Sequence, residues 1–413
     1  MFIAGAGAVG RVGRPGLSGN GARRPSFDID FVGSGSLGAG AVFTRASVGT
    51  YYNSSGVLVS AAINTPRFDY DPVTLQLKGL LLEDASTNVV LNSGNAASWG
   101  VGANVSGLPT VTANQSIAPD GTTSAARVAY PAVTNATNYS LLNPVGPLSV
   151  GSAVPYTLSV WLKGAVGGEI VYLSTTPDGT TYFRQQTTLT TQWQRFSLIT
   201  GNLTVANWYF QIGTDRRDTS QTGTPAQTIY AWGAQVEALP YMSSHIPTTS
   251  VSVTRAQDVL FYPVAALTGF KPPGGSWFAE FDYFSKPSNS RVIGDAGGSG
   301  GGGITPIFLP PSPSSSAQYD GVAAMNAIDV VVANVIVKCV STWATGQAKA
   351  CANGGAVNTS AALTTGYGLL NNIGIKIFTP ANPGLSDNMS GHIRRVSYWP
   401  RVLSDSEMQA VTT

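Results

Sequence analysis

Apolar and polar residues alternate in short runs along most of the chain, and residues typical of turns separate the runs. Between 89 and 258 the apolar runs predict strands at 125–130, 156–162, 169–174, 193–199, 208–212 and 228–232. Asp-Gly, Gly-Gly and Gly-Asn pairs fall between these strands, at 120–121, 167–168, 178–179 and 201–202. No segment with the period of a helix reaches a dozen residues. The pattern therefore predicts an all-β fold of the sandwich or jelly-roll type.

Similar runs occur on both sides of this block. Before it, short apolar runs at 27–32, 41–45, 56–60 and 75–82 predict a β-rich connecting region. After it, strands are predicted at 276–284, 327–332, 335–340, 349–355 and 369–377, interrupted by a Gly-rich stretch at 297–303 and a Pro/Ser-rich stretch at 310–316. We therefore divide the chain into 1–26, 27–88, 89–258 and 259–413.

The first segment, residues 1–26, is rich in glycine and has no hydrophobic periodicity. Such a segment buries too little apolar surface to offset the entropy of ordering its backbone. We interpret it as a flexible arm that orders only against a partner. Its basic residues, the candidates for attachment, are Arg11, Arg14, Arg23 and Arg24.

Composition supports the β-rich interpretation and argues against a nucleic-acid-binding protein and a membrane-spanning protein. The chain has 413 residues, of which 48 are Gly and 25 Pro, and only 11% are charged. A net charge of +2 provides no electrostatic footprint for nucleic acid. No apolar run approaches the ~20 residues of a membrane span, and the beginning of the sequence does not have the pattern of a secretory signal.

Candidate catalytic residues are few, and we expect no enzyme activity. The chain has two histidines, His245 and His392, and neither lies beside a nucleophile motif. Gly5–Gly10 matches a dinucleotide-binding fingerprint, but the strand and helix that the fingerprint needs are missing around it. We expect turn or surface roles for the carboxylates that lie close in sequence, namely Asp69 and Asp71, Glu83 and Asp84, Asp215 and Asp218, and Glu280 and Asp282. Two histidines also exclude a three-histidine metal site.

Tryptophan and cysteine positions suggest two further features. Most tryptophans lie inside predicted strands, so we expect them in cores. Trp99 and Trp343 lie in turn-like surroundings, which makes them the candidates for stacking on a sugar ring. Cys339 and Cys351 flank a predicted hairpin, and we interpret them as small buried hydrophobic residues. The sequence leaves open whether the two cysteines pair.

Several motifs resemble a known family. They are Lys78–Asn88 (KGLLLEDASTN), Ala118–Thr123 (APDGTT), Tyr156–Lys163 (YTLSVWLK) and Thr228–Glu237 (TIYAWGAQVE). In this order they resemble the carbohydrate-binding-module-like jelly roll of bacteriophage tail-fibre and head-fibre proteins, over roughly residues 43–258. The final stretch, Gly391–Ala410, resembles the last strand and terminal helix of concanavalin-like (laminin-G-like) lectin sandwiches. Its Ser404-Asp-Ser-Glu407 is a capping box, which predicts a short C-terminal helix.

The resemblance implies a structural protein of a phage virion, made in the bacterial cytoplasm. The function it favours is a homotrimeric tail fibre or receptor-binding adhesin that contacts host surface polysaccharide, with the N-terminal arm attached to other virion proteins. A capsid-attached head fibre or decoration protein and a polysaccharide-degrading spike enzyme remain as alternatives. Neither nucleic acid nor membrane insertion is expected. The resembled families include members with a structural calcium ion, but the sequence assigns no cofactor and no metal ligand.

Overall fold

The computed structural model describes most of the chain. The described residues are 24–151, 153–263, 274–285, 290–295, 305–309, 316–319, 324–328, 333–344, 346–360, 372–376 and 390–413. Residues 1–23 of the expected arm, with Arg11, Arg14 and Arg23, lie outside this part. Arg24 lies inside it and is exposed.

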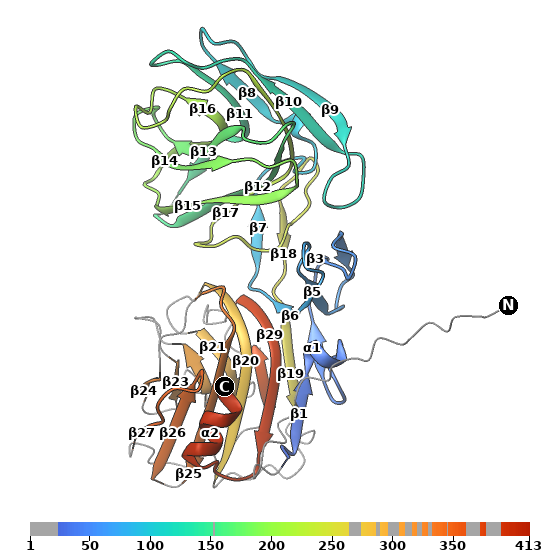
Figure 1. Ribbon diagram of the computed structural model, residues 1–413, viewed down its shortest axis with the longest axis vertical. Helices are drawn as coiled ribbons and strands as arrows, with labels where there is room; N and C mark the ends of the chain where they lie inside the picture. Colours follow the sequence, from blue (N-terminus) through green and yellow to red (C-terminus); the bar gives the residue numbers. More distant parts are fainter. Residues whose placement is uncertain are drawn as a thin grey trace, which may run out of the picture.

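The middle of the chain folds into a sandwich of two antiparallel five-stranded sheets, which confirms the all-β prediction (Figure 1). One sheet has the order β15 (Gln194–Asn202), β12 (Pro155–Gly164), β17 (Gln227–Glu237), β10 (Ala125–Tyr130) and β9 (Thr110–Ser116). The other has the order β14 (Phe183–Thr188), β13 (Ile170–Thr176), β16 (Ala206–Asp215), β11 (Tyr139–Val150) and β8 (Gly100–Ala103). Alternate residues of these strands point inward and form one hydrophobic core between the sheets. All six strands that the pattern predicts here are present.

A second sandwich contains the C-terminal part of the chain. Its eight-stranded sheet has the order β27 (Asn358–Ser360), β26 (Gln347–Ala352), β25 (Val337–Ala344), β20 (Gly274–Ser285), β29 (Ser390–Trp399), β6 (Leu77–Leu82) and β5 (Arg67–Tyr70), with β1 (Phe27–Asp30) also paired to β29. Its seven-stranded sheet has the order β2 (Val42–Thr44), β19 (Val259–Pro263), β28 (Asn372–Lys376), β21 (Ser290–Asp295), β22 (Thr305–Leu309), β23 (Ser316–Tyr319) and β24 (Ala324–Ile328). Buried aromatic rings, among them Trp277 and Tyr398, fill the core.

The division of the chain in space differs from the division along the sequence. Strands from residues 27–82, expected as a connecting region, are hydrogen-bonded into the C-terminal sandwich. The jelly roll is therefore inserted between two parts of the other sandwich. A two-stranded ribbon, β7 (Ser86–Asn88) paired with β18 (Val253–Arg255), carries the chain out and back (Figure 1). Cross-strand pairing over long sequence separations decides this arrangement, and local apolar patterns do not encode it.

One element of the N-terminal region belongs to the junction between the sandwiches. The hairpin of β3 (Gly49–Tyr52) and β4 (Leu58–Ala61) packs Leu58 against Trp161 and Trp232 of the jelly roll. The amide of Leu58 donates to the carbonyl of Pro119 at 2.9 Å, and the indole of Trp161 donates to the Tyr52 hydroxyl at 3.0 Å. The hairpin thus joins the jelly roll to the strands that follow it in the C-terminal sandwich.

A buried group of charges lies where the linking ribbon meets the C-terminal sandwich. We call it the linker ion cluster, and its members are Arg45, Arg67, Arg255, Glu83 and Asp258, all with side chains no more than 1% exposed. Arg45 and Arg67 both bind the Asp258 carboxylate, and Arg67 reaches Glu83 at 2.8 Å. Four segments that are distant in sequence therefore meet through charge-assisted hydrogen bonds.

Three short helices complete the described fold. They are α1 (Phe31–Ser34), the 3-10 helix η1 (Ala96–Ser98) and α2 (Asp405–Thr412). The predicted capping box is confirmed, because the Ser404 side chain accepts from the Glu407 amide while the Glu407 side chain accepts from the Ser404 amide. None of the helices in the described residues is long and apolar enough to cross a membrane.

The two cysteines are buried, as expected, and form no disulfide. In the pairing of β25 with β26, Cys351 lies opposite Val340, and Cys339 lies opposite Ala352. This offset of one residue places the two thiols on opposite faces of the sheet, because successive side chains of a strand alternate. Cys339 packs in the main core and Cys351 packs beneath α2.

Candidate functional site

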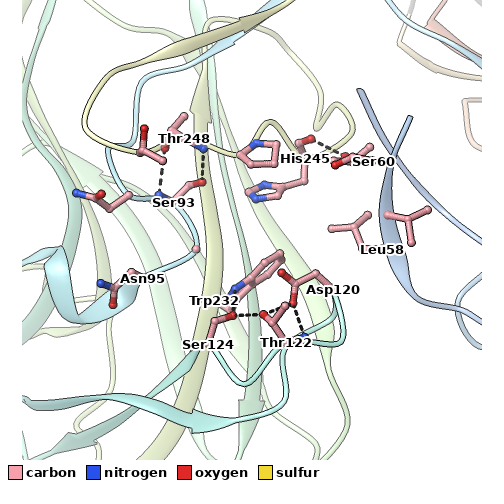
Figure 2. A pocket seen from close by; sticks show the side chains of 16 residues that line it. Leu58, Ser60, Ser93, Asn95, Asp120, Thr122, Ser124, Trp232, His245 and Thr248 are labelled. Carbon is pink, nitrogen blue, oxygen red and sulfur yellow. Dashed lines mark hydrogen bonds between the residues drawn. The ribbon is translucent and has the colours of Figure 1, made fainter. Parts of the chain in front are cut away.

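A pocket of about 380 Å³ opens where the β3–β4 hairpin meets one end of the jelly roll (Figure 2). We call it the small pocket. It is lined by Thr50 and Leu58–Ser60 of the hairpin, Asn92–Asn95, Asp120, Thr122, Ser124, Trp232 of β17, His245 and Pro247–Thr249. Most of these side chains carry a hydroxyl, an amide or a carboxylate. Asp120 is the only acidic or permanently basic residue among them.

Hydrogen bonds between the lining residues hold the polar groups in place. The indole of Trp232 donates to the Ser124 hydroxyl at 2.9 Å, and that hydroxyl lies 2.7 Å from the hydroxyl of Thr122. The Thr122 hydroxyl and amide both bond to Oδ1 of Asp120, at 2.7 and 3.0 Å. Figure 2 shows this chain of bonds along one wall of the pocket. The turn at Asp120-Gly121, which the sequence predicts, places the carboxylate there.

A second pair of bonds fixes the opposite wall. The amide of Ser93 donates to the Thr248 hydroxyl at 3.1 Å, and the amide of Thr248 donates to the Ser93 hydroxyl at 2.9 Å. This reciprocal arrangement ties the segment after β7 to the segment after His245 (Figure 2). The pocket is therefore preformed, as binding sites for small ligands usually are.

His245 borders the small pocket and is 2% exposed. Its ring packs against two indoles that also contact each other, with its centroid 5.2 Å from that of Trp161 and 5.1 Å from that of Trp232. Burial, together with the charge of Arg195, lowers the pKa of His245 well below its ordinary value, so the ring is neutral at pH 7. Nδ1 is buried and has no hydrogen-bond partner within the protein. A neutral imidazole with such an atom has hydrogen-bonding capacity left for a ligand or a water molecule.

A larger cavity, of about 1020 Å³, also borders the hairpin. We call it the interdomain groove, because its lining comes from the jelly roll, the hairpin and the C-terminal sandwich. The jelly roll contributes Trp193, Gln194, Arg195 and Ile199 on or beside the edge strand β15, while Lys78 and Phe284 come from β6 and β20. Leu58 and His245 line both cavities.

Beside the groove, a buried histidine joins three strands of the C-terminal sandwich. His392 of β29 places Nδ1 2.8 Å from Asp282 of β20 and Nε2 3.1 Å from Asp69 of β5. Lys78 reaches the same Asp69 at 2.6 Å. We call these four residues the His392 cluster. Burial by itself lowers the pKa of His392, but the charge of Asp282 and the hydrogen bonds to Asp282 and Asp69 outweigh it, so the pKa is raised.

The structure corrects several expectations about individual side chains. Trp99 and Trp343, the candidates for sugar stacking, lie in two different cores with exposed fractions of 6% and 1%. Neither ring is available to a ligand. Turn residues surround each of them in sequence, but the sheets close over both rings in space.

Glu280 and Asp282, expected in turn or surface roles, lie on one face of β20, and that face is covered. Glu280 is 6% exposed and accepts from Arg394 of the neighbouring strand at 2.9 Å. Asp282 belongs to the His392 cluster. The alternation along β20 is that of a strand with one wet face, whereas the complementary residues that cover this face come from β29, more than a hundred positions away in sequence.

Sequence reasoning missed the small pocket, because its lining comes from five separate segments. One signal was available for the linker ion cluster. Phe43-Thr-Arg-Ala46 and Val253-Thr-Arg-Ala256 repeat the same four-residue pattern, and the structure brings Arg45 and Arg255 of these two segments to the same Asp258.

Comparisons with known proteins give similarities of structure without a sequence family. No protein-family model matches the chain, and no curated protein matches it significantly. Among solved structures it is similar to the CBM40 domain of Ruminococcus gnavus IT-sialidase bound to α2,3-sialyllactose, with 17% identity and a TM-score of 0.32, over 37% of this chain and 92% of that one. It is also similar to Trypanosoma rangeli sialidase in complex with the inhibitor DANA, with 16% identity and a TM-score of 0.28, over 37% of this chain and 26% of that one. At these identities and TM-scores, the similarities carry no conclusion about ligand or activity.

Proposed function

We propose that this protein is a carbohydrate-binding adhesin of a phage particle, and that the small pocket takes a sugar unit of a host surface glycan. The observation that carries the proposal is the lining of the pocket: fixed hydroxyl, amide and carboxylate groups beside a tryptophan and a neutral histidine. A sugar presents hydroxyl groups that donate and accept along its edge and apolar C–H groups on its face. A preformed site with a few placed polar groups suits such a ligand.

The charge of the pocket narrows the class of sugar. Asp120 is its only acidic or permanently basic lining residue, and the neutral His245 adds no positive charge. A carboxylate on the sugar would meet the Asp120 carboxylate in a partly enclosed site, where like charges repel more strongly than in water. We therefore propose a neutral or amino sugar as the ligand.

The first prediction is that a large side chain placed in the small pocket weakens glycan binding. Ser60 is exposed on β4 and lines the small pocket, so Ser60→Trp should place an indole in the cavity without disturbing the core. Binding to immobilised bacterial surface polysaccharides, measured by surface plasmon resonance, should weaken at least about tenfold, which corresponds to ~1.4 kcal/mol.

The matched control is Ser55→Trp, an exposed serine in the turn of the same hairpin that lines neither cavity. This variant should bind like the unmodified protein. Equal binding by both variants would place the site elsewhere. Failure of the unmodified protein to bind any neutral or amino-sugar polysaccharide would contradict the proposed function itself.

We propose that the protein binds the glycan without cleaving it. This is supported by the partners of the carboxylates that lie close in sequence. Asp69 and Asp282 are engaged by His392, Asp215 by Arg217, Asp218 by Arg184, Glu83 by Arg67 and Glu280 by Arg394. Incubation with a polysaccharide that binds should leave the length of the polymer unchanged in size-exclusion chromatography. Shortening of the polymer would favour a polysaccharide-degrading spike instead.

The second prediction concerns the place of the protein on the particle. We propose a homotrimeric fibre that is held by the N-terminal arm and turns both sandwiches toward the host. The resemblance of the sequence motifs to phage fibre proteins motivates this part of the proposal. Immunogold labelling of intact virions should then mark the tail. Labels on the capsid would favour a head fibre or decoration protein, and absence from purified virions would contradict a virion function.

A further inference from the structure

The small pocket and the interdomain groove both border the β3–β4 hairpin. Thr50 and Ser60 line the pocket, whereas Tyr51, Tyr52 and Val57 line the groove. Both strands of the hairpin therefore contribute to both cavities. The two cavities meet at Leu58 and His245, which border both.

We propose that the interdomain groove is a second saccharide subsite, so that the protein binds an oligosaccharide that extends from the small pocket past His245 into the groove. This inference rests on the proposed function of the pocket and adds the length of the ligand. The groove encloses about 1020 Å³ against about 380 Å³ for the pocket. If the pocket holds one sugar unit, the groove has room for about two more.

The groove offers an aromatic surface held in a fixed position. Trp193 is half-buried, and its indole donates to the Ile117 carbonyl at 2.8 Å. The ammonium of Lys163, which does not line the groove, lies 4.9 Å from the centre of the Trp193 ring. A ring that is oriented by a hydrogen bond and a cation loses little conformational entropy when a sugar face stacks on it.

A half-buried arginine, Arg195, lines the same groove. The Arg195 guanidinium lies 4.3 Å over the ring of Trp161, and it donates to the Ser243 carbonyl at 2.7 Å and to the Ser159 hydroxyl at 3.0 Å. Its Nε is buried and has no partner within the protein. Nδ1 of His245, a residue that borders both cavities, is likewise buried without a hydrogen-bond partner. Leaving such groups unpaired is unfavourable. Both residues line the groove, so a shift of either side chain would let a saccharide oxygen or hydroxyl pair with it.

The test uses the full chain and a polysaccharide that binds in the plasmon resonance experiment, cut by mild acid into fragments from a single unit upward. Isothermal titration should show that affinity rises at least about tenfold from the single unit to fragments long enough to reach the groove. Gln194 is exposed beside Trp193, so Gln194→Trp should remove this gain while the single unit binds as before. Gln185→Trp, on β14 and outside both cavities, is the matched control and should keep the gain.

Trp193→Ala should remove the same gain by deleting the stacking surface, and Gln194→Trp covers the case in which this core-edge variant does not fold. The inference is overturned if affinity does not depend on length, or if the gain survives in Gln194→Trp. In either outcome the single unit still binds and the proposed function stands. If no fragment of any length binds, both the inference and the proposed function fail.

Discussion

Replacing Arg67 by methionine should lower the free energy of unfolding by about 3–5 kcal/mol, the usual effect of removing one partner from a buried ion pair. The Arg67 side chain is fully buried and binds both Asp258 and Glu83. It also donates to the Thr50 carbonyl at 3.0 Å and to the Ser244 hydroxyl at 2.7 Å. Methionine fills a similar volume but leaves these acceptors without their donor. Urea denaturation followed by tryptophan fluorescence measures the loss.

The control is Arg184→Met, at an arginine that is 40% exposed and pairs with Asp218 at 3.2 Å. Solvent screens this pair, so its loss should cost less than about 1 kcal/mol. Equal effects of the two substitutions would show that the linker ion cluster does not hold the sandwiches together. We expect Arg67→Met to cost more than Arg184→Met because of desolvation. A buried carboxylate that loses its cation has no water molecules to take the place of that cation.

Replacing His392 by glutamine should destabilise the protein most between about pH 4 and 6.5, where the loss should be about 3 kcal/mol. The pKa of His392 is raised in the folded protein, so its contribution is fully present below the unfolded value near 6.5 and is lost as pH rises through the folded pKa. Burial would raise the pKa of Asp69 and of Asp282, but interactions with His392 outweigh it and lower both values. Their contribution is therefore present above about pH 4 and is lost as pH falls through their folded pKa values. The measurement is urea denaturation of both proteins across this pH range.

The other histidine supplies a control of opposite sign. The pKa of His245 is lowered by burial and by Arg195, so the unfolded chain binds a proton that the folded protein does not. His245 therefore lowers the free energy of unfolding as pH falls below about 6.5. Comparison of His245→Phe with the unmodified protein should show that the variant gains relative stability toward low pH. A pH-independent effect of His392→Gln would mean that the His392 cluster is not charged in the folded protein.

Much of the secondary structure could be predicted, because its causes are local. The strand at Ala125–Tyr130 alternates buried and partly buried residues, and the turn before it contains Asp120-Gly121. Ser404 and Glu407 are three residues apart, the spacing that a capping box needs. Each of these signals lies within a few residues of the structure it specifies, and therefore each is visible in the pattern of the chain.

The candidate site could not be predicted in the same way. The side chains of Thr50, Asp120, Trp232 and His245 come from different segments, and only the docking of the hairpin on the jelly roll brings them to one pocket. Trp99 and Trp343 show the opposite error, because their turn-like surroundings in sequence predicted exposed rings and the structure buries both. Burial depends on what the rest of the chain lays over a residue, and the residues next to it in sequence do not reveal that.

By itself, the sequence determined that this protein is all-β and where most jelly-roll strands and the last helix lie. These properties follow from alternation, turn chemistry and composition, which act over short distances along the chain. Only the tertiary structure decided that β1, β2, β5 and β6 join the C-terminal sandwich, that Arg45 and Arg255 meet at Asp258, and that a polar pocket opens beside Trp232. The physical reason is that these features depend on strand pairing and desolvated charges between segments far apart in sequence, and such contacts leave almost no local trace.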